Sequence, residues 1–225
     1  MAPELIYCGD GNKRFAQIAI ESGMLYGAQL PPRSLHYPIH MADQNWKAPD
    51  RPNYMAALAK YRPFMATVID LERLEQLPTV LDWAEEAAQW VSVVMIIPKI
   101  FGIIPAIPER INGADVRLGF SVPTAYGGTE VPAWEFSGRP VHLLGGTPHK
   151  QIELSHYMDV VSIDGNYSKL MASKFGQFWQ PGTATWAKDR HWPKLSEAGC
   201  FAHFDIPYIA FRRSCEAIVK FWRQP

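Results

Sequence analysis

Val141-His-Leu-Leu-Gly-Gly-Thr-Pro148, followed by a helical stretch and then by Val160-Val-Ser-Ile-Asp-Gly-Asn166, is the segment on which the predicted fold depends. Both apolar runs are short and rich in β-branched residues, and each ends in Gly, Pro, Asp or Asn residues that are typical of loops. Residues 151–158 between them are long enough for about two helical turns. The segment is therefore predicted to be a strand-helix-strand unit with parallel strands. In such folds ligands bind at the loops that follow the strands, so Asp164 lies where catalytic residues usually occur.

Composition limits the classes of protein to be considered. The chain has 225 residues, 48% of them hydrophobic, which suits one large domain with a substantial core. Lys plus Arg equals Asp plus Glu at 22 each, which argues against a basic domain that coats nucleic acid but permits a local basic patch. The cysteines form no close pair and the first residues lack a signal-peptide pattern, so a cytoplasmic location is expected. The longest apolar run, residues 91–98, is too short to span a membrane.

The chain on either side of this unit contains further strands and helices. Strands are predicted at residues 5–8, 25–29, 39–42, 64–69, 91–97 and 116–122. Helices are predicted at residues 13–22, 52–61, 77–90, 104–111, 168–175 and 212–222. Residues 30–38 are too few and too rich in proline for a helix, so one helix of a regular alternation is expected to be missing. The pattern predicts an α/β fold, a somewhat degenerate (β/α)8 TIM-like barrel, with an open doubly wound sheet as the main alternative.

One domain accounts for the whole chain. No repeat, low-complexity tract or linker interrupts it, so residues 1–225 are predicted to form a single barrel-like domain. Residues 180–225 are expected to be a C-terminal extension that packs on the barrel and ends in the final helix. The stretch from Trp179 to Lys194 is aromatic and basic. It is either a surface for nucleic acid or a packed hydrophobic flap, and the sequence leaves both interpretations open.

Closing the barrel would gather polar strand ends on one face. These residues are Asp10, Gln29, Asp43, Asp70, Lys99, Ser121 and Asp164. Several carboxylates around one mouth cannot all ionise freely, and Lys99 would pair with one of them, so perturbed pKa values are expected there. The alternative is that Asp43 and Asp70 cap the following helices and that Lys99 is a structural ion-pair partner. The pair Gly145-Gly146 permits close approach of a ligand, although a tight turn explains it equally well.

No metal or cofactor is predicted. The chain has no Cys-x-x-Cys motif, and its 7 histidines show no zinc-type pairing. Neither a dinucleotide fingerprint nor a P-loop is present. His142 lies inside a predicted strand, where a hydrogen-bonded core histidine is the better interpretation.

Three strands carry a resemblance to a known family. His142-Leu-Leu-Gly-Gly-Thr-Pro148 and Met158-Asp-Val-Val-Ser-Ile-Asp164 resemble consecutive strands of the tRNA-guanine transglycosylase superfamily, in particular its short phage and bacterial relatives linked to deazaguanine modification of DNA. Leu118-Gly-Phe-Ser-Val122 is similar to the family strand whose backbone contacts the base. Asp43 and Asp70 follow the third and fourth strands, where the family keeps two base-recognising aspartates. Lys99 stands where the family usually has a glutamine, and the family's C-terminal zinc site is absent from the sequence.

The resemblance implies an enzyme that exchanges guanine for a deazaguanine base in nucleic acid. Asp164 would be the nucleophile that forms a glycosyl-enzyme intermediate, with Asp43 as a second catalytic carboxylate. The expected substrate-binding residues are Asp70, Lys99, Gly119, Ser121, Tyr126, Gly145, Gly146 and Asn166, of which Tyr126 would stack on the base. The expected partners are nucleic acid, DNA rather than tRNA, and a free purine-like base, with a homo-oligomer or a partner subunit left open.

Two other classes of function remain open. One is a small-molecule barrel lyase or aldolase that uses Lys99 to form a Schiff base, for which borohydride trapping is the test. The other is a non-catalytic binding protein that keeps a barrel shell, for which Asp164→Ala would leave its cellular activity intact.

Overall fold

The barrel is a closed ring of parallel strands. The computed structural model describes residues 2–9, 11–124, 127–182, 186 and 205–224. Its 9-stranded sheet closes because β9 pairs with β1 and β5 pairs with β7, and only β6 is antiparallel to its neighbour. The parallel strands are β1 Glu4–Cys8, β2 Leu25–Gln29, β3 Met41–Asp43, β4 Met65–Thr67, β5 Val93–Ile96, β7 Ala114–Ser121, β8 Val141–Leu144 and β9 Val160–Asp164. The predicted (β/α)8 barrel is thereby confirmed, since an open sheet would have two free edges.

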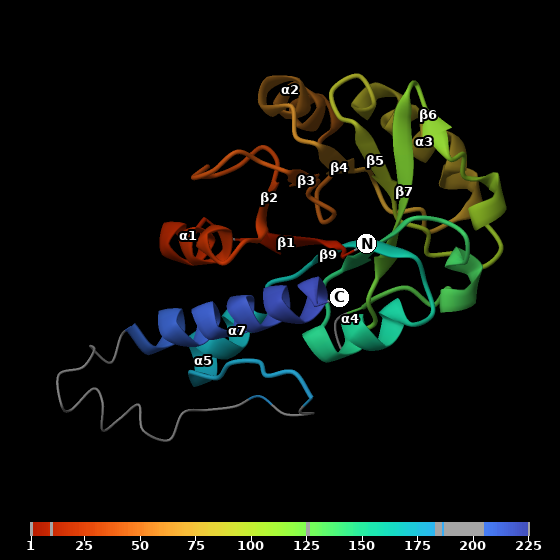
Figure 1. Ribbon diagram of the computed structural model, residues 1–225. Coiled ribbons are helices and arrows are strands. Elements are labelled where there is room, and N and C mark those ends of the chain that lie inside the picture. Colours follow the sequence, from red (N-terminus) through yellow and green to blue (C-terminus); the bar gives the residue numbers. More distant parts are fainter. Residues whose placement is uncertain (1, 10, 125–126, 183–185, 187–204, 225) are drawn as a thin grey trace, which may run out of the picture.

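Helices cover only part of the barrel (Figure 1). They are α1 Lys13–Glu21, α2 Arg51–Tyr61, α3 Leu77–Ala87, α4 Pro148–Ser155, α5 Tyr167–Phe175 and α7 Ile206–Arg223. No helix joins β2 to β3, as the proline-rich residues 30–38 predict, and all of that connection is described. In the described residues, the connections that follow β5 and β7 contain the 3-10 turns η2 Ile104–Ala106 and η3 Ala133–Phe136 but no α-helix. The barrel is therefore degenerate at three of its connections.

The helix predicted at residues 104–111 is wrong. Beyond η2 the chain forms β6 Arg110–Ile111, which pairs antiparallel with the start of β7. The turn between these strands is Asn112-Gly113, and both residues have positive φ angles, 47° and 89°. An Asn-Gly pair adopts this left-handed backbone readily and is a strong signal for a two-residue hairpin turn. A local hairpin therefore replaces the expected helix.

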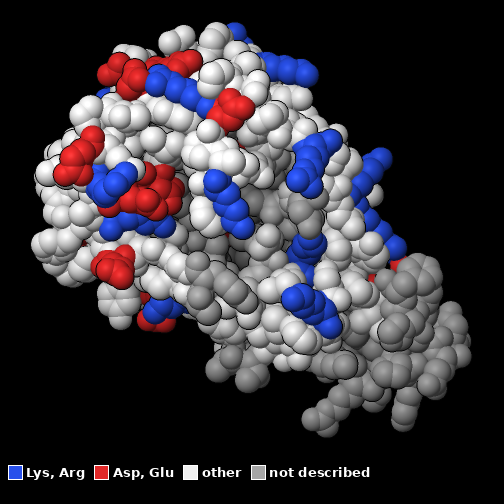
Figure 2. Space-filling model, turned by 180° about the vertical axis from the view of Figure 1, so that it is seen from behind, with Lys and Arg blue, Asp and Glu red and all other residues white. Residues whose placement is uncertain are grey.

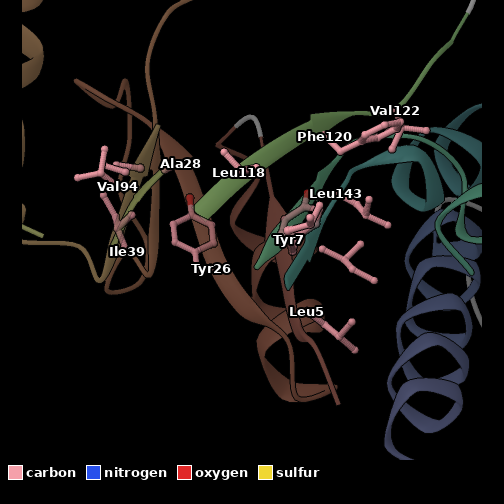
Figure 3. Packing of buried hydrophobic residues seen from close by; sticks show 14 of the residues in the cluster. Leu5, Tyr7, Tyr26, Ala28, Ile39, Val94, Leu118, Phe120, Val122 and Leu143 are labelled. Carbon is pink, nitrogen blue, oxygen red and sulfur yellow. The ribbon is translucent and has the colours of Figure 1, made fainter. Parts of the chain in front are cut away.

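The last helix begins earlier than predicted and packs along α1 and α5 (Figure 1). Phe211 of α7 contacts the Phe15 ring of α1 edge-on at 5.1 Å between ring centroids, and it lies 5.2 Å from the Tyr7 ring of β1. In Figure 3 the Leu5 side chain of β1 points toward this helix. Trp179 is buried and packs edge-on against Phe221, whereas most of the aromatic and basic stretch to Lys194 lies outside the described residues.

In the described part of the chain no helix is long and apolar enough to cross a membrane.

Side-chain alternation along the strands separates two apolar layers. One layer packs between the barrel and its helices and includes the residues labelled in Figure 3. The other fills the barrel and consists of Ile6, Met41, Met65, Val93, Met95 and Ile97. Because successive side chains of a strand point to opposite faces, Asp43, which lies two residues after Met41, also faces the barrel interior. By the same rule the inner layer ends in polar side chains at the C-terminal mouth.

Polar side chains also close the opposite end of the barrel. Arg117 Nη1 donates hydrogen bonds to Glu4 Oε2 and to Ser162 Oγ, both at 2.7 Å. His40 Nε2 lies 3.4 Å from Glu4 Oε1. Burial alone would raise the pKa of Glu4, but the hydrogen bonds and charges of His40 and Arg117 outweigh it and lower this pKa to about 2. Glu4 is thus an ionised anchor for Arg117.

Glu4→Gln is expected to lower the free energy of unfolding by about 2 kcal/mol at pH 7. The folded-state pKa of Glu4, about 2, lies below its ordinary value of 4.5, so this stabilisation is complete above 4.5 and is lost as pH falls toward 2. Urea unfolding of the wild type and the variant at several pH values measures the difference. Glu21→Gln, which removes the exposed partner of Arg212, is the control and should have a smaller effect. A difference that does not shrink below pH 4.5 would contradict this account.

Candidate active site

A cleft of about 600 Å³ opens at the C-terminal ends of the barrel strands. Loops that follow β3, β4, β5, β7 and β8 form its walls, and its volume is typical of small-molecule sites. The predicted site residues among its lining are Asp43, Asp70, Lys99, Ser121, Gly145 and Gly146. The structure therefore brings six of the ten predicted residues to one cavity.

Asp164, the last residue of β9, lies beside this cleft. Its Oδ1 accepts a hydrogen bond of 2.8 Å from the Gly145 N–H, and its side chain is 12% exposed. Burial would raise the pKa of Asp164, but hydrogen bonds from His142, the Gly145 N–H and the Cys8 thiol together hold it below its ordinary value. Gly145 has a φ of 69°, so a glycine here lets the loop turn its N–H onto the carboxylate. Asp164 is therefore an ionised carboxylate at neutral pH.

His142 links Asp164 to the interior of the barrel. This histidine is fully buried, with Nδ1 2.6 Å from Ser162 Oγ and Nε2 3.4 Å from Asp164 Oδ1. Since Ser162 Oγ accepts a hydrogen bond from Arg117, its own hydrogen is free for His142 Nδ1. This order leaves an N–H at Nε2 that points toward Asp164. Together with Glu4 these residues form a polar chain from one end of the barrel to the other.

Asp43 has the opposite electrostatic environment. Its Oδ1 accepts a hydrogen bond of 2.8 Å from the Thr67 hydroxyl. Burial is the largest cause of its pKa shift, and the negative charges of Asp164 and Asp70 add to it, so the pKa of Asp43 rises to about 7 despite the Thr67 hydrogen bond. Asp43 therefore gains and loses a proton near neutral pH while Asp164 stays ionised. Carboxyl groups whose pKa values diverge in one site commonly divide acid-base and nucleophilic roles.

Asp70 and Lys99 form an ion pair in the same cleft. Lys99 Nζ lies 3.5 Å from Asp70 Oδ2, and the two side chains are 18% and 25% exposed. Burial raises the pKa of Asp70, the Lys99 charge opposes this, and Glu72 adds to the rise. The expected pairing of Lys99 with a carboxylate at the mouth is thus present. The capping alternative is wrong for both aspartates, because Asp50 caps α2 and Gln76 precedes α3.

Besides Asp164, which lies beside this cleft, three predicted site residues are absent from its described lining. Gly119 faces the barrel interior, but a Cβ there would come within 2.7 Å of Ile97 and 2.9 Å of Leu144, so side chains occupy the space that it leaves. Glycine at this position therefore makes room for the neighbouring side chains to pack. Asn166 is exposed and precedes α5, where its side chain makes no capping hydrogen bond. Tyr126 lies outside the described residues.

Other residues of the site were not predicted from the sequence. Trp46 lines the cleft with 66% of its surface exposed, and Lys47 Nζ lies 5.1 Å from its ring centroid. Thr67 donates a hydrogen bond to Asp43, and Gln44 follows Asp43 in the chain. Gln44 comes directly after β3 and Thr67 ends β4. Because the ends of parallel strands share one face, these positions could have identified both residues from the sequence. Within the described ranges, no group of three or more His, Cys, Asp and Glu side chains is arranged to hold a metal ion.

Asp43→Asn is expected to stabilise the protein at alkaline pH, by about 2–4 kcal/mol at pH 8. The folded-state pKa of Asp43, about 7, lies above its ordinary value of 3.8, so stability is lost as pH rises from 3.8 through 7. Asparagine does not ionise, so the variant keeps its stability as pH rises. Urea unfolding of the wild type and the variant at pH 4 and pH 8 measures the difference in free energy of unfolding. Asp159→Asn, at an exposed residue directly before β9, is the control. Equal effects of Asp43→Asn at both pH values would show that burial of the charge is not the cause.

No match was found among curated proteins. Residues 19–223 match DUF6610, described as a family of unknown function, and this range includes each of the cleft residues and Asp164. The chain therefore belongs to the DUF6610 family, whose function is unknown.

Proposed function

We propose that the protein is a transglycosylase-like enzyme that exchanges guanine for a deazaguanine base in nucleic acid. The observation that carries this proposal is the pair of carboxyl groups at one barrel mouth with opposite pKa shifts, lowered for Asp164 and raised to about 7 for Asp43. A nucleophilic carboxylate must be ionised, and exchange of a base needs a group that gives and takes a proton near neutral pH. Asp164 and Asp43 meet these two requirements.

The residues support a balanced two-step exchange. An oxygen of Asp164 attacks the anomeric carbon, the bond from this carbon to the base nitrogen breaks, and Asp43 gives its proton to the leaving base. The incoming base then loses a proton to Asp43, and its nitrogen attacks the anomeric carbon. The ester bond to Asp164 breaks and the carboxylate is regenerated. Asp70 and Lys99 supply an acceptor and a donor for the edge of the base.

Features of the surface support a polynucleotide substrate. A base in a polymer must leave its stack before it can react, and exposed aromatic rings beside basic groups bind such bases. Trp46, with Lys47 beside it, offers such a ring at the cleft. Figure 2 shows Lys and Arg side chains on both sides of a hollow in one face of the molecule. The preference for DNA over tRNA rests on the resemblance alone.

The Schiff-base alternative gains no support from the site. A Schiff base needs an uncharged amine, which enzymes obtain by placing lysine in an apolar pocket or beside another cation. Lys99 instead lies against a carboxylate of Asp70. The ion pair favours a role for Lys99 in binding.

Intact-mass spectrometry tests the proposal. The protein is incubated with guanine-containing single-stranded DNA or tRNA and with a deazaguanine base, and wild type is compared with Asp164→Asn. We expect a covalent protein-nucleic acid species in the wild type only. Asp159→Asn, a change at the opposite end of the same strand, should keep it. Absence of the species with both polymers, or a Lys99-dependent adduct trapped by borohydride, would contradict the proposal.

A further inference from the structure

A second cleft of about 570 Å³ lies against the outer face of β2, where no helix joins β2 to β3. The buried residues Tyr26 and Ala28 contribute to its apolar part. In a regular barrel a helix would cover this face of the strand. Residues 30–38 leave it open, and the resulting volume falls in the range of sites that hold small organic ligands.

Gln44 connects this second cleft with the active-site cleft, because it belongs to the lining of both. It follows Asp43 directly. Since neighbouring side chains of an extended chain point to opposite faces, Gln44 is directed outward where Asp43 is directed into the barrel mouth. Gln44 is only 3% exposed, yet its Oε1 has no hydrogen-bond partner among the described residues.

An unpaired buried carboxamide oxygen is unusual in a native protein and calls for a ligand or a water as partner. The backbone of Gln44 is fixed, since its N–H donates a 3.0 Å hydrogen bond to Thr67 Oγ1. The same hydroxyl donates to Asp43 Oδ1 at 2.8 Å. The unpaired Gln44 Oε1 is thereby held close to the proposed acid-base group. A ligand edge that carries a hydrogen-bond donor would pair with this oxygen.

The chemistry of the lining indicates which ligand would fit. Two further carboxamides, Gln29 and Asn45, line the cleft together with Arg33 and the apolar surface of Tyr26. Asp50 also lines it, but its carboxylate accepts hydrogen bonds from Asn53 and is thereby occupied. Carboxamides recognise the edges of nucleobases, and apolar surfaces pack against their faces.

We propose that this cleft is a second binding subsite, which holds the nucleoside adjacent to the reacting one, with its base edge paired to Gln44. The inference rests on the proposed function, because it places the neighbouring unit of the same polynucleotide. Because no helix joins β2 to β3, the open face of β2 becomes part of the proposed substrate-binding surface.

Binding to the full chain with Asp164→Asn, which lacks the proposed nucleophile, tests this inference. Dissociation constants are measured by calorimetry for deoxyguanosine and for trinucleotides with guanine in the centre, flanked by thymine or by adenine. At least one trinucleotide should bind about tenfold more tightly than the nucleoside. Adding Gln44→Leu should bring the ratio of the two constants close to one, whereas Gln89→Leu, an exposed residue after α3, should leave it unchanged.

The thermal stability of Gln44→Leu separates binding from a structural role. Leucine removes an unpaired buried group, so the variant should unfold at an equal or higher temperature. A lower unfolding temperature, or a trinucleotide advantage that survives Gln44→Leu, would overturn the subsite while the covalent intermediate on Asp164 could still form. A Gln44-dependent advantage without that intermediate would refute the proposed reaction and leave the subsite. Failure of every ligand to bind would overturn both.

Discussion

Asp164→Asn is expected to slow the proposed base exchange at least about a thousandfold and to abolish its covalent intermediate. An amide has nearly the shape of the carboxylate, but it carries no charge with which to attack the anomeric carbon. Its oxygen can still accept the hydrogen bond that Gly145 N–H donates to Asp164, so the loop geometry should persist. The loss should therefore appear in the chemical step, measured as single-turnover incorporation of a labelled base.

The control for this loss is again Asp159→Asn, which makes the same chemical change directly before β9, at the N-terminal end of the barrel. It should exchange bases at the wild-type rate. Circular dichroism of both variants checks that the barrel is intact. Exchange by Asp164→Asn within about tenfold of wild type would exclude a nucleophilic role for this residue, since the loss of a nucleophile costs far more.

The buried partners of Asp164 explain why a carboxylate can stay charged at this depth. His142 and Ser162 are neighbours in the register of β8 and β9. Arg117 donates to Ser162 from β7, which pairs with the other edge of β8. Each group therefore has a partner, and the chain ends at the ionised Glu4. A single unpaired charge inside the barrel would be costly, whereas a connected chain that satisfies its donors is tolerated.

The sequence was sufficient to predict the barrel and the residues that meet at its C-terminal mouth. Parallel strands must end on one face, so the polar residues after them, such as Asp43, Asp70 and Lys99, were expected to meet there, and they do. The helix predicted near residue 104 was wrong because two prolines were read as a helix start, while the Asn112-Gly113 turn signal was overlooked.

Other parts of the site depend on register and packing, which one sequence does not reveal. His142 was expected to be a hydrogen-bonded core residue, but its contact with Asp164 follows from the pairing of β8 with β9. Gly119 resembled a residue that contacts a base, yet its environment is set by the side chains of Ile97 and Leu144 on neighbouring strands. The lack of a hydrogen-bond partner for Gln44 Oε1 is likewise a property of the folded state, since any glutamine in an unfolded chain is hydrated.

The rate of exchange is expected to fall about tenfold for each pH unit above about 7, because the proposed acid must be protonated. The raised pKa of Asp43 keeps its proton in place below pH 7. The pKa of Asp164 is lowered, so the nucleophile stays ionised at every pH above its ordinary value of 3.8. The profile should therefore be level between these values and descend on the alkaline side. Asp43→Asn should reduce the level part by about a hundredfold or more and remove the descent.

Asp70→Asn tests the cause of this descent. The negative charge of Asp70 contributes to the raised pKa of Asp43, and its removal also leaves the Lys99 ammonium without its carboxylate partner. Both changes favour the ionised form of Asp43, so the descent should begin at a lower pH in this variant. A descent that stays near pH 7 in Asp43→Asn would assign the titration to another group. A descent that moves to higher pH in Asp70→Asn would show that the charges at the mouth do not set the pKa of Asp43.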